Sequence, residues 1–142
     1  MAPTWQSGWT VLLIEDDRDI AVLIGEILGE EGYATTVATT IEAGIALLDR
    51  QRFDLVLSDA FADDGFGEDR WQGLEAIRRA AGTTPVIICT AHRADDFGDH
   101  AARGFAALLE KPFDLDALIA LMERTLHERE EVAGPCRERG EG

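Results

Sequence analysis

The sequence has 142 residues, of which 46% are hydrophobic and 29% charged, which fits one globular domain and excludes wholesale disorder. Thirteen Lys and Arg against 28 Asp and Glu give a net charge of −15, which argues against direct nucleic-acid binding because phosphates require a basic surface. The longest apolar runs are far too short to span a membrane, and the N-terminus lacks the basic cluster of a signal peptide. We therefore expect a cytoplasmic protein that binds no membrane.

Five short apolar runs alternate along the chain with five segments of helical periodicity. The runs predict strands at Thr10–Ile14, Ala34–Ala38, Asp54–Ser58, Pro85–Thr90 and Ala106–Glu110. The intervening segments predict helices at Arg18–Glu31, Ile41–Arg50, Trp71–Ala81, Arg93–Arg103 and Asp114–Arg129. Gly32, Gly82 and Gly104 follow predicted helix ends, where a left-handed backbone conformation is favoured.

This alternation predicts a three-layer α/β domain, because right-handed crossovers place helices on both faces of a parallel sheet. The periodicity leaves the order of the strands open. We place the domain at residues 9–127, after a loose N-terminal arm at residues 1–8. The charged, glycine-containing segment at residues 128–142 predicts a disordered tail.

Polar residues follow the apolar runs, at the carboxyl ends of the predicted strands. They are Glu15, Asp16 and Asp17 after the first strand, Asp59 after the third, Thr90 at the end of the fourth and Lys111 after the fifth. In a parallel sheet these ends meet at one edge, where open α/β folds bind their ligands. We therefore expect several carboxylates, a hydroxyl and an ammonium to converge in a single crevice.

Converging carboxylates repel one another unless a cation lies among them. Mg²⁺ suits such a site because it accepts one or two carboxylates and keeps water and phosphate oxygens as further ligands. Lys111 adds a positive charge suited to a phosphate oxygen, and Thr90 adds a hydrogen-bond donor. Together these groups predict phosphoryl transfer, in which an Asp can serve as the acceptor.

Four segments resemble the signature segments of bacterial response-regulator receiver domains, which act in two-component signalling. They are Val11–Asp17, Phe53–Asp59, Ile87–Ala91 and Glu110–Phe113, and their order and spacing match over residues 9–126. The resemblance is to a stand-alone, single-domain receiver. It implies a flavodoxin-like, doubly wound fold with five parallel strands in the order 2-1-3-4-5 and five helices.

The resemblance also implies a role for each candidate site residue. Asp59 would be the phosphoacceptor, and Thr90 and Lys111 would contact the phosphoryl group. The metal, Mg²⁺ or Mn²⁺, would be held by Asp59, by Asp16 directly, by Glu15 largely through water, and by the backbone carbonyl of Phe61. The phosphodonor would be a sensor histidine kinase or a histidine phosphotransfer protein.

Three features depart from the family pattern. The segment at residues 60–72 predicts a longer, more acidic loop than usual after the acceptor, either a solvated surface loop or a lid over the phosphoryl group. Leu108 replaces the aromatic residue that often transmits the signal, so output must travel by another route. Phe61 and His92 occupy the two positions that tune dephosphorylation, and they leave the lifetime of the phosphorylated state open.

Two functions of different classes fit the sequence. In the first, the domain catalyses no more than its own phosphorylation and dephosphorylation and signals by protein contact. In the second, it is an unphosphorylated scaffold that binds a partner constitutively. An unrelated Asp-based phosphatase is disfavoured because Phe61 stands where a second catalytic Asp would be required. Retention of the full acidic and basic set favours the first function.

The resemblance implies a downstream protein partner and either a monomer or a phosphorylation-dependent dimer. The expected contact face combines the fourth helix, the fifth strand and the fifth helix. Its first helix would carry Arg93, Asp95, Asp96, Asp99 and Arg103.

Overall fold

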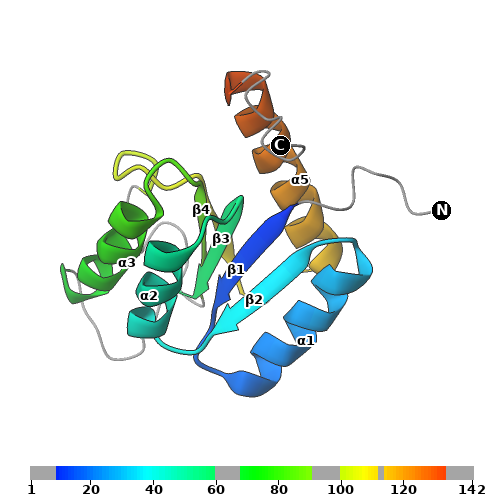
Figure 1. Ribbon diagram of the computed structural model, residues 1–142, viewed down its shortest axis with the longest axis horizontal. Helices are drawn as coiled ribbons and strands as arrows, with labels where there is room; N and C mark the ends of the chain where they lie inside the picture. Colours follow the sequence, from blue (N-terminus) through cyan, green and yellow to red (C-terminus); the bar gives the residue numbers. More distant parts are fainter. Residues whose placement is uncertain (1–8, 60–67, 91–99, 112–113, 134–142) are drawn as a thin grey trace.

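The protein is described by a computed structural model that covers residues 9–59, 68–90, 100–111 and 114–133 (Figure 1). The strands are β1 (Thr10–Ile14), β2 (Ala34–Ala38), β3 (Leu55–Asp59), β4 (Val86–Thr90) and β5 (Ala107–Glu110). The helices are α1 (Arg18–Glu30), α2 (Ile41–Arg50), α3 (Glu68–Ala81) and α5 (Leu115–Ala133). None of the described helices is both long and apolar enough to cross a membrane.

The strands form one parallel sheet in the order β2-β1-β3-β4-β5, which confirms the predicted three-layer α/β fold and its strand order. Helices α1 and α5 cover one face of the sheet, while α2 and α3 cover the other (Figure 1). The edge strands are β2 and β5, so β1, β3 and β4 are flanked on both sides.

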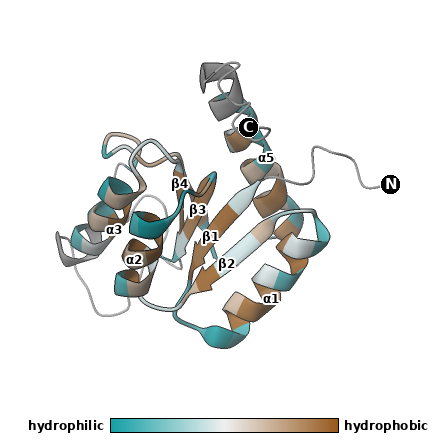
Figure 2. Ribbon diagram, viewed as in Figure 1, coloured by the Kyte–Doolittle hydropathy of each residue, from teal (hydrophilic) through white to brown (hydrophobic). Residues whose placement is uncertain are grey.

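Two apolar layers form the core, one on each face of the sheet. On one face, Leu12, Ile14 and Ile88 pack against α2 and α3. On the other, Leu13 and Ile87 pack against α1 and α5. Successive residues of a strand point to opposite faces, so a strand buried on both sides must be apolar throughout. The hydropathy colouring shows this for the central strands, which are mostly brown, whereas the edge strand β2 is largely pale (Figure 2).

Several predicted helix boundaries were wrong. Helix α3 begins at Glu68, so the loop expected over residues 60–72 is helical from residue 68. Helix α5 continues to Ala133, four residues beyond its predicted end at Arg129. Of the helix predicted at Arg93–Arg103, residues 93–99 lie outside the described residues, and residues 100–104 form turns.

The starts of β1 and β3 are joined by a buried polar pair. The carboxylate of Asp54 accepts hydrogen bonds from the backbone N–H of Thr10 at 2.8 Å and from its hydroxyl at 3.2 Å. The Asp54 N–H in turn donates to the Thr10 hydroxyl at 3.2 Å. Because Asp54 is only 6% exposed, these bonds replace the water that it loses on folding. They hold β1 and β3 in register at the end opposite the predicted site.

Candidate metal and phosphoryl site

The predicted site residues lie at neighbouring strand ends. Glu15 and Asp16 follow β1, Asp59 ends β3, Thr90 ends β4 and Lys111 follows β5. The register pairs Ile14 with Ser58, Asp59 with Cys89 and Thr90 with Glu110, so the strands end almost level with one another. The parallel sheet thus brings residues from four segments of the chain to one edge.

Lys111 connects two of the carboxylates. Its ammonium nitrogen lies 2.9 Å from Asp59 Oδ1 and 3.2 Å from Glu15 Oε1. The Lys111 side chain is 24% exposed, that of Asp59 15% and that of Glu15 4%. Ion pairs in such partly buried positions are screened less by water and salt than surface pairs, so these contacts fix the ammonium in place.

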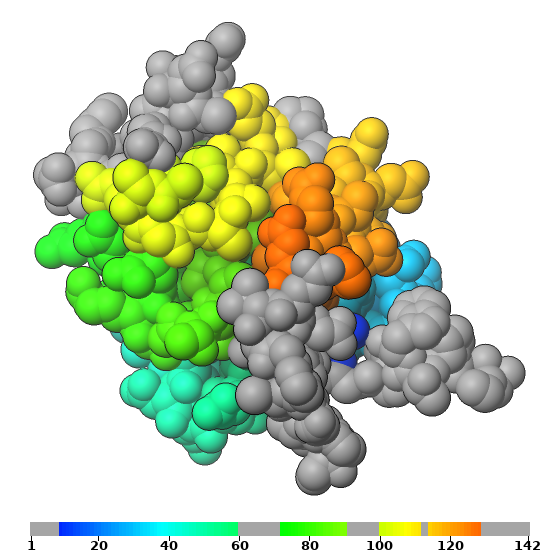
Figure 3. All heavy atoms as spheres, turned by 90° about the horizontal axis from the view of Figure 1, so that it is seen from above, coloured from blue at the N-terminus to red at the C-terminus, as the bar shows by residue number. Residues whose placement is uncertain are grey.

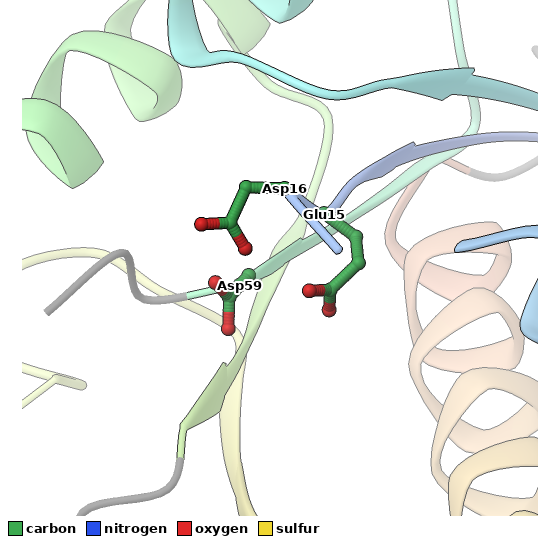
Figure 4. Close-up of side chains that lie close together, drawn as sticks. All are labelled: Glu15, Asp16 and Asp59. Carbon is green, nitrogen blue, oxygen red and sulfur yellow. The ribbon is translucent and has the colours of Figure 1, made fainter. Parts of the chain in front are cut away.

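Three carboxylates gather on the same edge. Glu15, Asp16 and Asp59 each offer one oxygen, and these atoms lie within 4.8 Å of one another. Figure 4 shows the three side chains grouped at the ends of β1 and β3. Glu15 is buried, Asp59 is intermediate and Asp16 is exposed, so the group opens outward to solvent through Asp16.

The electrostatics of the group favour an added cation. Burial, and then the negative charge of Asp59, raise the pKa of Glu15 above its ordinary value, although the Asp17 N–H and Lys111 oppose this. Burial lowers the pKa of Lys111, but its hydrogen bond to Asp59 and the charges of Asp59 and Glu15 outweigh that effect and raise it. Lys111 is therefore held as the cation, while the carboxylates still carry excess negative charge.

The donor set fits a hard divalent ion. Mg²⁺ and Mn²⁺ prefer oxygen ligands, and carboxylates placed this close together relieve their repulsion by sharing such an ion. The candidate ligands Glu15, Asp16 and Asp59 are therefore brought together as the sequence predicted. The remaining candidate, the backbone carbonyl of Phe61, lies outside the described residues.

Thr90 occupies the predicted strand end and is fully buried. Its backbone carbonyl accepts a hydrogen bond from the Lys111 N–H at 2.6 Å, so the end of β4 is tied to the lysine. Sequence reasoning did not predict this backbone contact, because the register of β5 against β4 cannot be read from periodicity.

Asp17 has a different role from the one its position suggested. Its carboxylate accepts hydrogen bonds from the N–H groups of Asp19 and Ile20 and caps the N-terminus of α1. The sequence signal was an Asp directly before an amphipathic helix, which is a favoured N-cap. The Asp17 N–H also donates to Glu15 Oε2 at 3.2 Å, so the helix start helps to orient a site carboxylate.

The expected contact face is described only in part. Residues 100–111, in yellow, lie between α3 and α5 in Figure 3. A groove of about 510 Å³ runs between β5 and α5, and Leu108 and Arg124 contribute to its lining. Arg103 forms an ion pair with Glu75 of α3 at 2.7 Å. The charged residues expected at positions 93–99 lie outside the described residues.

A doubly wound parallel sheet with carboxylates and a lysine at its carboxyl edge defines a class of α/β proteins that bind ligands there. The family model described as the response regulator receiver domain matches residues 11–123. The chain belongs to this family.

Curated relatives and solved structures agree with this assignment. The chain is 34% identical over 119 residues to the transcriptional regulatory protein GlrR of Escherichia coli, covering 83% of this chain and 26% of GlrR. It is 36% identical over 115 residues to the response regulator FleR of Pseudomonas aeruginosa, covering 80% of this chain and 24% of FleR. The chain thus spans about a quarter of the length of these relatives. The non-phosphorylated HemR receiver domain of Leptospira biflexa matches with a TM-score of 0.71 and 28% identity, covering 84% of this chain and 94% of that one.

Proposed function

We propose that this domain accepts a phosphoryl group on Asp59 in a reaction that requires Mg²⁺ or Mn²⁺, and that it passes the signal on by protein contact in the cytoplasm. The observation that carries the proposal is the Lys111 ammonium between Asp59 and Glu15, beside three carboxylates within 4.8 Å. A scaffold requires no such arrangement. The same edge supplies an acceptor, a fixed cation and the oxygens for a metal.

Asp59 is the acceptor because its carboxylate is partly exposed to solvent and lies beside the Lys111 ammonium. One of its carboxylate oxygens would attack the phosphorus of a phosphohistidine. As the new P–O bond forms, the P–N bond breaks, and its electron pair stays on the imidazole nitrogen of the donor. The product is an acyl phosphate on Asp59. The side chain is 15% exposed, which leaves it open to a donor while holding it in position.

Lys111 and Thr90 would act on the transferred group. The ammonium, now 2.9 Å from Asp59 Oδ1, is placed to neutralise charge on a phosphoryl oxygen attached there. Thr90 supplies a hydroxyl from the neighbouring strand end. Positioning and charge neutralisation supply most of the catalysis in phosphoryl transfer, so fixed groups of this kind suffice.

Glu15, Asp16 and Asp59 would hold the metal, with the Phe61 carbonyl as the proposed backbone ligand. Bound there, Mg²⁺ would supply further positive charge for the phosphoryl oxygens. We infer that the donor is a sensor histidine kinase or a histidine phosphotransfer protein, since an Asp acceptor at an open sheet edge suits a phosphohistidine. The output partner is a further protein.

The test uses acetyl phosphate with Mg²⁺ and intact-mass spectrometry. We expect one phosphoryl adduct, lost when EDTA replaces Mg²⁺. Asp59→Asn should form none, while the matched control Asp49→Asn, at an exposed position of α2, should form as much as the native protein. Failure of the native protein to form an adduct with both acetyl phosphate and a phosphohistidine donor would support the scaffold function instead.

A further inference from the structure

The two edges of the sheet differ in charge. At one edge, β5 ends at Glu110 and is followed by Lys111, beside a groove lined in part by His100 and Arg124. At the other, β2 lies within residues 32–41, a stretch that contains no charged residue. Proteins usually protect an exposed strand edge with charged residues, proline or a bulge. The sequence of β2, Ala-Thr-Thr-Val-Ala, has no charge and no proline.

The backbone of β2 offers hydrogen-bonding groups to a partner. The Ala34 N–H donates to the carbonyl of Trp9, and the Ala38 carbonyl accepts from the Glu15 N–H. The backbone N–H and C=O groups of Ala34 and Ala38 therefore point toward β1. Alternate residues of a strand face the same neighbour, which places Thr36 with them. The N–H and C=O groups of Thr35 and Val37 therefore point outward. Among the described strands, only β1 pairs with β2.

Apolar side chains flank this edge. Val37 is 39% exposed and Val22 of α1 is 57% exposed. A Cβ placed on Gly25 would lie 3.8 Å from Val37 Cγ2, so this part of α1 covers the face of β2 from which Val37 projects. A Cβ placed on Gly29, one turn further, would have no neighbour within 4 Å, which leaves the helix flank open to close approach. Figure 1 shows β2 at the sheet margin, between α1 and α2.

We propose that β2 pairs antiparallel with β2 of a second copy, about a two-fold axis at Thr36. In that register Thr35 faces Val37 of the partner copy, and each such pair exchanges two backbone hydrogen bonds, as outward-facing residues do in antiparallel sheets. A symmetric contact sets each residue against its own patch, so charged residues there would repel. With a net charge of −15, two copies approach most easily at this uncharged edge.

The contact is small, because it consists of one strand edge and a helix flank from each copy. Interfaces below the standard size are weak, so we expect a dissociation constant on the order of 100 µM. The pairing does not require phosphorylation, since β2 lies at the margin of the sheet and Asp59 at the end of β3. The Asp59→Asn variant should therefore dimerise like the native protein, which separates this inference from the proposed function.

Sedimentation velocity of the full chain from about 5 µM to 1 mM tests the proposal. Val37→Lys should weaken dimerisation about tenfold or more, since a charge on an edge strand opposes pairing. Leu23→Lys is the matched control, because Leu23 is 54% exposed on the same helix as Val22 and the change adds the same charge. It should leave dimerisation unchanged. Circular dichroism should show that both variants are folded.

Hydrogen exchange gives a second readout that needs no substitution. Amides in the β2 peptide should exchange more slowly as the protein concentration rises, while peptides from β5 should not change. A native protein that stays monomeric to 1 mM would overturn the proposal. So would a dimer that Val37→Lys and Leu23→Lys weaken equally, or one whose concentration-dependent protection falls on β5.

Discussion

Replacing Gly44 with Ala tests how closely α2 packs on the strand that carries the site. A Cβ at this position would lie 2.6 Å from Ile14 Cδ1 and 3.0 Å from Ile14 Cγ1. Ile14 is fully buried in the core and directly precedes Glu15, so it has little space into which to move. Overpacking of this kind costs about 1–3 kcal/mol, and the better helix propensity of Ala returns about 1 kcal/mol. We expect a net loss of about 0–2 kcal/mol in the free energy of unfolding.

Gly29→Ala is the matched control, because a Cβ there meets nothing within 4 Å. It should stabilise the protein by about 1 kcal/mol through helix propensity alone. Ile14→Val removes the Cδ1 methyl group and should cost about 0.5–1.5 kcal/mol by itself. Combined with Gly44→Ala it should cost less than the sum, since the new methyl group fills the vacated space. Urea denaturation followed by circular dichroism measures all four proteins. A Gly44→Ala variant as stable as Gly29→Ala would refute the packing argument.

Three further predictions concern other parts of the molecule. Burial raises the pKa of Tyr33 from 10.0 to about 12. The Tyr33 hydroxyl therefore ionises at lower pH in the unfolded chain than in the folded protein. As a result, the free energy of unfolding falls as pH rises from 10 to 12, by up to about 1.4 kcal/mol per pH unit. Urea denaturation at pH 9 and 11 should show this loss in the native protein and not in Tyr33→Phe. Asp54→Ala should cost about 1.5–3 kcal/mol, because Thr10 loses a charged acceptor, and a thermal melt unchanged from native would contradict this. Lys111→Met should slow adduct formation from acetyl phosphate about 10²-fold in a mass-spectrometry time course, while an unchanged rate would show that the ammonium beside Asp59 is not used.

The strands were predictable because burial on both faces requires continuous apolar runs. The predicted bounds of β1 and β2 match the structure, and those of β3, β4 and β5 shift by one residue. The shift of β3 arises because Asp59 at its end takes part in the ladder with β4. The strand order came from family resemblance, since periodicity carries no information on which strands are neighbours.

The helix ends were harder to predict, because charged residues give no apolar period. Glu68 and Asp69 were assigned to a loop, yet acidic residues are favoured in the first turn of a helix, and α3 begins with them. The run Glu-Glu-Val-Ala at residues 130–133 was left outside the predicted helix, although most of its residues are good helix formers, and α5 includes it. The informative signals were the acidic first turn for α3 and helix propensity for α5, rather than amphipathicity.

The composition of the site was predictable, but its internal contacts were not. Strand ends in a parallel sheet meet, so Glu15, Asp59 and Lys111 were expected together. Which carboxylate would be buried depends on side-chain direction, and the structure buries Glu15 and exposes Asp16. The bond from Lys111 to Glu15 in addition to Asp59 depends on the same geometry. Distances of this kind arise from packing and cannot be read from spacing along the chain.

Lys111 links three adjacent strands through its position after β5, one backbone hydrogen bond and one ion pair. Its backbone follows β5, and its N–H donates a hydrogen bond to the Thr90 carbonyl of β4. Its ammonium forms an ion pair with Asp59 of β3. Under the proposed function, a phosphoryl group on Asp59 would change the contact of the Lys111 ammonium, and the Lys111 backbone would be the first to move. The Lys111 backbone lies directly after β5, which lines the groove together with α5. Under the proposed function, this chain of contacts would carry the effect of phosphorylation to β5, by a route that requires no aromatic ring at position 108.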